Sequence, residues 1–219
     1  MRNALAPGDP VALARELVAV DSRNPDLVPD GPGEGACAQL LAGMLHDWGF
    51  RVELHEVTRG RPNVVARIGA AGGPSLMLNG HLDTVGVERM THAPWDPDVR
   101  DGRLYGRGSA DMKGGIAAMC AAAWRAANAP GGLAGEVIVA AVVDEEFRSI
   151  GTGALTVEVA MVVVGTVFFA RAIYGPEVDA TIGPRSCRCR TTPVCPCSWR
   201  TSMPSATFHC RTAFSPAEV

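Results

Sequence analysis

Apolar residues recur at helical spacing in two segments near the start of the chain. The first follows Asp9-Pro10, which has the composition of a helix N-cap with proline at the first helical position. Its expected apolar face consists of Val11, Leu13, Leu17, Val18 and Val20. The second segment runs from about Glu34 to Trp48, with Leu40, Leu41, Met44 and Leu45 directed inward and Gly49 as its end. An alanine-rich segment, roughly Ile116 to Asn128, predicts a third helix.

Four further segments have the composition of β-strands: Arg51 to Val57, Asn63 to Ile68, Ser75 to Asn79, and Glu136 to Val143. The first alternates polar and apolar residues, which is typical of an edge strand, whereas the third is apolar throughout and predicts a more central position. The segment from Asn24 to Gly33 is rich in Pro, Asp and Gly and predicts a surface loop. Strands that alternate with helices favour an α/β layered fold.

Composition narrows the classes of function. The chain has 219 residues, 47% of them apolar and 20% charged, which is enough for one good-sized domain with a buried core. A formal charge of −3 gives no reason to expect a nucleic acid partner. The N-terminal residues lack the apolar core of a signal peptide, so a cytoplasmic location is expected. The longest uncharged run, Val159 to Ala170, is shorter than a bilayer span, and no membrane association is expected.

The cysteines are distributed unevenly. Cys37 and Cys120 lie in helical, apolar surroundings and are expected to be buried thiols. The other five are in the last part of the chain, at Cys187, Cys189, Cys195, Cys197 and Cys210. Their C-x-C pairs lack the C-x2-C spacing of zinc ribbons, so this part of the chain does not predict a structural zinc site.

A candidate metal motif follows the third predicted strand. His81 and Asp83 are two residues apart, and the period of an extended backbone places their side chains on the same side. An imidazole and a carboxylate then converge, as a metal ligand and its orienting partner require. Alone, His-x-Asp is a weak signal, because strand-end loops often carry such residues for solubility.

Two acidic motifs strengthen that signal. Asp111 lies where a glycine-rich segment enters the alanine-rich helix, so it is either a helix N-cap or a carboxylate placed to bridge cations. Asp144-Glu145-Glu146 follows the last predicted strand and is either a solvated strand exit or a cation site, since a cation would relieve the repulsion between adjacent carboxylates. Adjacent residues leaving a strand point in opposite directions, so Glu145 and Glu146 are expected to take different roles.

Other polar residues have simpler interpretations. Arg107, Lys113 and Arg148 are candidates to bind a substrate carboxylate, with surface charge as the alternative. The remaining histidines of this region, His46, His55 and His92, are expected on the surface or in a loop and receive no role. A calcium-binding module is disfavoured, because calcium prefers many oxygens on one loop and these acids are dispersed and accompanied by histidine.

Together the three motifs resemble one family, the dinuclear-metal amidohydrolases and peptidases that include acetylornithine deacetylase, succinyl-diaminopimelate desuccinylase and carboxypeptidase G. The residues that carry the resemblance are Asn79-Gly80-His81-Leu82-Asp83-Thr84-Val85, Gly106-Arg107-Gly108-Ser109-Ala110-Asp111-Met112-Lys113-Gly114-Gly115, and Asp144-Glu145-Glu146 with Gly151-Thr152-Gly153-Ala154. Their order and spacing agree with the family, and the resemblance covers roughly Val11 to Leu155. It implies a zinc-peptidase-like catalytic domain in which helices flank a mixed β-sheet.

The resemblance also implies a role for each motif residue. His81 would ligate one metal, Asp111 would bridge two, and Glu146 would ligate the second. Asp83 would orient His81, and Glu145 would be the general base for water that two divalent ions, usually zinc or cobalt in this family, activate for attack on an amide carbonyl. The implied substrate is an N-acyl amino acid or a small peptide.

The resemblance ends before the chain does. The family's later acidic ligand, its last histidine ligand and its inserted lid or dimerisation domain have no match here, so the expected fold is truncated and the family's frequent homodimer lacks its usual interface. Glu177 and His209 do not fit the pattern and receive no role.

The last part of the chain, Arg185 to Val219, has almost no periodic apolar pattern. We therefore expect residues 1–183 to form the N-terminal half of a catalytic domain and residues 184–219 to be an irregular tail, for which a frameshift near Gly183 is a hypothesis that sequencing the coding DNA tests. The alternative function is a catalytically incompetent fragment with an incomplete metal site, because three ligands cannot fill two tetrahedral shells.

Overall fold

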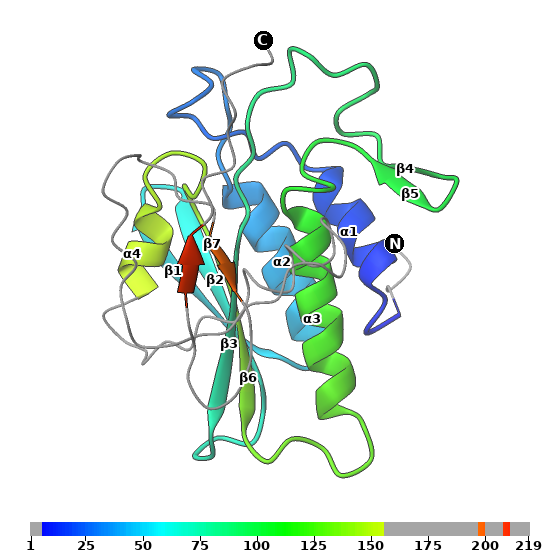
Figure 1. Cartoon of the computed structure of the whole chain (residues 1–219), viewed down its shortest axis with the longest axis vertical. Coiled ribbons are helices and arrows are strands. Elements are labelled where there is room, and N and C mark those ends of the chain that lie inside the picture. The colour runs from blue at the N-terminus through cyan, green and yellow to red at the C-terminus, as the bar shows by residue number, and fades with distance from the viewer. Residues whose placement is uncertain (1–5, 156–196, 200–207, 211–219) are drawn as a thin grey trace. The chain divides into compact units, whose positions relative to one another are not determined.

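A four-stranded mixed sheet forms the centre of residues 6–155 (Figure 1). The computed structural model describes residues 6–155, 197–199 and 208–210. The strands are β1 (Arg51–Thr58), β2 (Arg61–Gly69), β3 (Ser75–His81) and β6 (Glu136–Val142), in the order β1-β2-β6-β3. The β1–β2 and β2–β6 pairs are antiparallel and the β6–β3 pair is parallel. The parallel pairing brings the carboxyl ends of β3 and β6 to the same end of the sheet, so the residues that follow the two strands lie close together.

Helices cover both faces of this sheet (Figure 1). On one face lie α1 (Pro10–Val18), α2 (Gly35–Asp47) and α3 (Lys113–Ala127), and on the other lies α4 (Ile150–Leu155). The central strands supply alternate residues to the two sides: Val137 and Val139 of β6 pack under the three helices, while Ile138 and Ala140 pack with Leu155 of α4. Burial on both faces explains the continuous apolar run in β6. The expected α/β fold with a mixed sheet flanked by helices is thus confirmed.

The predicted helices are confirmed with small differences. The carboxylate of Asp9 accepts hydrogen bonds from the backbone N–H groups of Val11 and Ala12, so Asp9 is the N-cap of α1 and Pro10 follows it. Val11, on the first turn of α1, is exposed, contrary to its expected place on the apolar face. In α2 and α3, Cys37 and Cys120 are buried free thiols, as expected.

Two expectations about position are wrong. Within the described residues β3 is an edge strand rather than a central one, since it pairs with β6 alone, and in its apolar run Leu76 is exposed while Met77 is buried. The segment after Asn24 is largely exposed, but Asn24 itself is fully buried, because its side chain bonds to carboxylates at the edge of the sheet.

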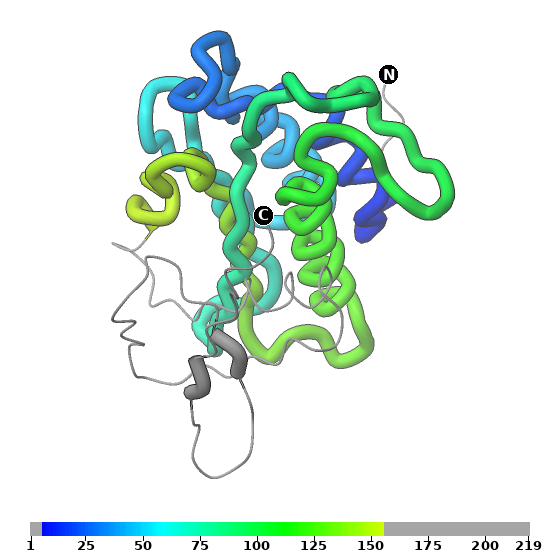
Figure 2. The backbone as a smooth tube through the Cα atoms, turned by 45° about the horizontal axis from the view of Figure 1, so that its top comes forward, coloured from blue at the N-terminus to red at the C-terminus, as the bar shows by residue number. Residues whose placement is uncertain are grey.

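The long connection between β3 and α3 leaves the sheet and returns to the start of α3 (Figure 2). It contains a short hairpin that periodicity did not predict, β4 (Asp98–Arg100) with β5 (Arg103–Tyr105). Separately, β7 (Cys197–Trp199) pairs with β8 (Phe208–Cys210). The uncharged run from Val159 to Ala170 and the hypothesised frameshift near Gly183 lie outside the described residues. None of the described helices has the length and apolar character needed to cross a membrane.

Candidate metal centre

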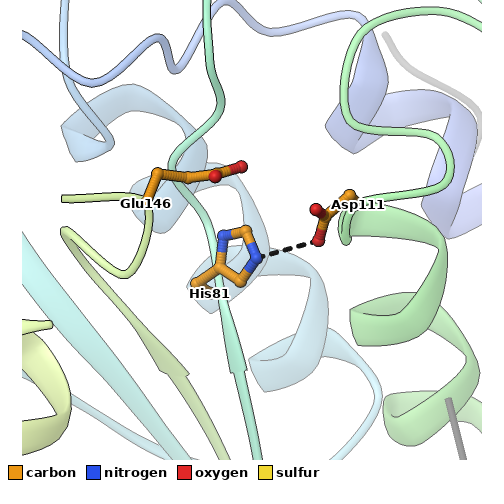
Figure 3. Close-up of side chains that lie close together, drawn as sticks. All are labelled: His81, Asp111 and Glu146. Carbon is orange, nitrogen blue, oxygen red and sulfur yellow. Dashed lines mark hydrogen bonds and ion pairs between the residues drawn. The ribbon is translucent and has the colours of Figure 1, made fainter. Parts of the chain in front are cut away.

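Three side chains from separate motifs meet at the edge of the sheet (Figure 3). His81 is the last residue of β3, Asp111 lies just before α3, and Glu146 lies in the turn that follows β6. One ligand atom from each lies within 4.8 Å of the others. A nitrogen and two carboxylate oxygens at this separation are a donor set that zinc and similar cations accept.

The imidazole of His81 is held in one orientation. Its Nδ1 lies 3.0 Å from the backbone oxygen of Asp83 and 3.3 Å from Asp83 Oδ1. Both of these neighbours are acceptors, so Nδ1 carries the proton and donates it. Nε2 then faces the other acids, 3.1 Å from Asp111 Oδ1 and 3.6 Å from Glu145 Oε2. A histidine ligand whose second nitrogen is bonded to a carboxylate is the common arrangement at metal centres.

Asp83 links His81 to the acidic turn, the segment from Asp144 to Arg148 that follows β6. Its carboxylate is fully buried and accepts hydrogen bonds from the backbone N–H groups of Glu145 and Glu146, each at 3.0 Å. It also accepts a bond of 2.8 Å from Asn24 Nδ2. One side chain therefore fixes the imidazole and the turn that carries two glutamates.

The site carries more carboxylate than its single imidazole can neutralise. Burial opposes the charged form of His81, but the hydrogen bond to Asp83 and the charges of Glu145 and Asp111 outweigh it and raise the pKa of His81 to about 9. Burial raises the pKa of Glu146, and the charges of Asp111, Asp83 and Glu145 raise it further against the opposing effect of His81. A divalent cation at this position would remove the repulsion, so the residues fit a metal.

The structure separates the two roles considered for Asp111. The N-cap of α3 is Met112, which has no side-chain capping bond, and the carboxylate of Asp111 is 66% exposed and directed at His81. Asp111 is therefore not a helix cap. The glycines before it allow the chain to turn into the helix. Gly108, for example, has φ of 81°, and a Cβ at this position would lie 3.0 Å from side-chain carbons of Thr84 and Lys113.

The glutamates of the acidic turn do not point in opposite directions as expected. Both approach His81, because β6 ends at Val142 and residues 145–148 form a turn whose amides are tied to Asp83. Glu145 stays half-exposed, while Glu146 is partly buried. The two side chains thus differ in exposure and in contact, and they do not lie on opposite faces of a strand.

Three cationic residues were considered as partners for a substrate carboxylate. Lys113 is fully buried and its Nζ donates to the backbone oxygen of Val20 at 2.7 Å, so its ammonium group is engaged within the protein interior. Arg107 donates to the backbone oxygen of Gly86 at 2.6 Å. Arg148 is exposed, and its guanidinium lies 4.6 Å from the ring centroid of Phe147. These contacts favour structural roles for Lys113 and Arg107 and surface charge for Arg148.

The other histidines of residues 6–155 lie outside the site. The side chain of His46 is 80% exposed, as expected of a solvent-facing residue. His55 lies on the edge strand β1 beside Glu53, and the ring of His92 packs edge-on against Tyr105. None of them belongs to the group of three donors.

Sequence reasoning missed a buried polar network behind the turn. Its members are Asn24, Glu34, Arg61 and Asp144, whose side chains hydrogen-bond to one another. Asp144 had been grouped with its two neighbours, but it turns inward with φ of 62° and is fully buried. The available signal was the strand boundary: Arg61 opens a strand that continues into the apolar residues Val64, Val65 and Ala66, and a charge buried beside them needs a partner.

The chain is similar in sequence to known hydrolases. Residues 77–200 match the family model described as peptidase family M20/M25/M40. The chain is 45% identical over 120 residues to the succinyl-diaminopimelate desuccinylase of Methylorubrum extorquens, which covers 52% of this chain and 29% of the relative. It is 40% identical over 152 residues to that of Gluconobacter oxydans, with 67% and 37% covered. The chain thus spans about a third of the length of these relatives.

Solved structures share the fold. Human carnosine dipeptidase 1 superimposes with a TM-score of 0.56 at 26% identity, over 67% of this chain and 34% of that one. The M20 family metallo-carboxypeptidase Sso-CP2 of Sulfolobus solfataricus gives 0.50 at 22% identity, over 61% and 30%. The family model matches more than half of the chain and includes the His81, Asp111 and Glu145-Glu146 motifs. The chain therefore belongs to peptidase family M20/M25/M40, a family of hydrolases.

Proposed function

We propose that the protein acts in metal-dependent hydrolysis of an amide bond, in an N-acyl amino acid or a small peptide. The observation that carries the proposal is the convergence of His81, Asp111 and Glu146 within 4.8 Å, with Glu145 beside them. The names of similar proteins support the reaction class, since they describe removal of a succinyl group and cleavage of dipeptides. Two divalent ions, zinc or cobalt, would be the cofactors.

Each residue has a role that its contacts support. His81 would present Nε2 to the metal, because Asp83 engages Nδ1. Asp111, which is well exposed and 3.1 Å from His81 Nε2, would bridge the two ions, and Glu146 would hold the second. Bound divalent cations would supply an acidified water and polarise the amide carbonyl. Glu145 would take the proton of the attacking water and pass it to the departing amine, which its 50% exposure permits.

A second candidate function rests on the number of ligands. Within residues 6–155, the structure places three donor side chains together, and two tetrahedral shells need more than three donors and a shared water. A chain that supplied no further ligands would be a catalytically incompetent fragment with a single weak site. The number of ions bound separates the two candidates.

Hydrolysis of N-succinyl-diaminopimelate and of a dipeptide panel, with Co²⁺ or Zn²⁺ restored after chelation, tests the proposed function. We expect cobalt-stimulated release of a free amine, two ions per chain, and loss of about 10² to 10⁴ in kcat for Glu145→Gln, which lacks the proton acceptor. His46→Ala, an exposed change outside the site, should retain full activity. No hydrolysis with one or no ion bound would support the incompetent fragment instead.

A further inference from the structure

A buried guanidinium lies behind the acidic turn. Arg61 is the first residue of β2 and is 8% exposed. Its Nε donates to Glu34 Oε2 at 2.7 Å and its Nη2 to Glu34 Oε1 at 2.8 Å, a two-point pair with a carboxylate that is itself fully buried. Paired, charge-assisted bonds of this kind fix both partners in direction as well as distance.

This ion pair contacts the first residue of the acidic turn at two points. Arg61 Nη2 lies 3.2 Å from Asp144 Oδ1, and the backbone N–H of Asp144 donates to Glu34 Oε1 at 3.0 Å. Asp144 has φ of 62°, in the left-handed region that residues with a Cβ adopt uncommonly. The two contacts hold Asp144 in this conformation at the point where the chain leaves β6.

Asn24 extends the network to the candidate metal centre. Its Oδ1 accepts from Arg61 Nη2 at 3.3 Å, and its Nδ2 donates to Asp144 Oδ1 at 2.9 Å and to Asp83 Oδ2 at 2.8 Å. Asp83 in turn holds the amides of the two glutamates and Nδ1 of His81. A continuous series of hydrogen bonds thus runs from Arg61 to the residues that would hold a cation.

We infer that Arg61 is a positioning residue for the metal centre, acting through Glu34, Asp144 and Asn24 on the turn that presents Glu145 and Glu146. Arg61 contributes its charge as well as its hydrogen bonds. Without the guanidinium, Glu34 and Asp144 would share a buried region with no opposite charge, and their repulsion would displace the turn. The part of this inference that concerns cation binding rests on the proposed function.

The test compares Arg61→Met with Arg67→Met in the full chain. Arg67 lies on the same strand and pairs with Glu136 at 3.5 Å, away from the site, so it is a matched control for loss of a β2 arginine. The first measurement is NMR-detected hydrogen exchange of the Glu145 and Glu146 amides in metal-free protein, relative to amides of the β2–β6 ladder. The second is Co²⁺ affinity by calorimetry.

For Arg61→Met we expect exchange of the two turn amides to accelerate about tenfold more than exchange of the ladder amides. We expect Co²⁺ affinity to fall by about 10- to 100-fold, the usual effect of removing an orienting partner. Arg67→Met should change neither. Arg61→Lys keeps the positive charge but cannot form the two-point pair with Glu34, so it should give a smaller effect in the same direction and serves if Arg61→Met does not fold.

The outcomes are distinct. Turn and ladder amides that accelerate equally, in whichever variant folds, would show a general loss of stability and overturn the positioning role. Selective exchange with unchanged Co²⁺ affinity would also overturn it, because the displacement would not reach the ligands. If the wild-type chain binds no Co²⁺, the proposed function fails, and the exchange ratio alone decides whether Arg61 positions the turn.

Discussion

Metal binding at His81 has to displace a proton, and this gives a quantitative test. The pKa of His81 is about 9 in the metal-free protein, because the bond to Asp83 and the nearby carboxylates outweigh burial. At pH 7 only about 1% of the imidazole would then be neutral, whereas an ordinary histidine with pKa near 6.5 would be about 75% neutral. A cation must take the neutral form, so binding releases a proton.

The expected release at pH 7 is about one proton per ion bound at His81, against about 0.25 for a histidine of ordinary pKa. The apparent affinity for Co²⁺ should rise about tenfold from pH 7 to pH 8, because the fraction of neutral imidazole increases about tenfold. With a histidine of ordinary pKa, the affinity would rise only about 1.3-fold. Calorimetric titration with Co²⁺ in buffers of different ionisation enthalpy counts the protons directly.

Two variants show where the released proton comes from. Asp83→Asn removes the principal group that raises the pKa of His81, so its release should fall toward about 0.25. His46→Ala, in which an 80% exposed histidine is lost, should behave as the wild type. A wild-type release near 0.2, independent of Asp83, would refute the assignment of His81 as a charged, carboxylate-held imidazole in the metal-free state.

Three further predictions concern stability and reactivity. Because the pKa of His81 is raised in the folded state, the charged imidazole stabilises the metal-free fold. This stabilisation is complete below about pH 6.5 and is lost as pH rises through about 9. The free energy of urea unfolding of the wild type, relative to His81→Asn, should therefore fall by about 3 kcal/mol over that range. Gly80→Ala should lower unfolding free energy by about 1 to 3 kcal/mol in the same assay, because the new Cβ would lie 2.7 to 2.9 Å from side-chain atoms of Met112, Met119 and Ile116; an unchanged midpoint would contradict this. Cys37 and Cys120 should resist a thiol reagent until the protein unfolds, since burial raises the pKa of both and that of Cys120 to about 12, and rapid native labelling of either would refute the packing.

Local sequence patterns predicted the elements around the site well. The strands that carry His81 and the acidic turn, and the helix after Asp111, are present within a few residues of their expected bounds. Period-two geometry also predicted that His81 and Asp83 meet, and their atoms lie 3.3 Å apart. These successes share a cause: each depends on residues that are adjacent or nearly adjacent in the chain.

The failures share the opposite cause. Nothing local marks Asn24, in a polar loop, as a buried partner of residues 59 and 120 positions away. The direction of Glu145 and Glu146 depends on Asp83, which follows a different strand, β3. The edge position of β3 within the described residues depends on its pairing with β6, and β4, β5 and α3 lie between these two strands in the sequence. These features depend on contacts between residues far apart in the chain, and the spacing of residues in one sequence does not reveal such contacts.

The most direct test of the central claim is the amount of Co²⁺ bound per chain at equilibrium dialysis, for the wild type and for a variant that combines His81→Ala, Asp111→Asn and Glu146→Gln. The three donors lie within 4.8 Å of one another, so the wild type should bind at least one ion per chain. The triple variant should bind none above background while retaining its fold by circular dichroism. Equal binding by the two proteins, or none by the wild type, would contradict a metal centre at these residues.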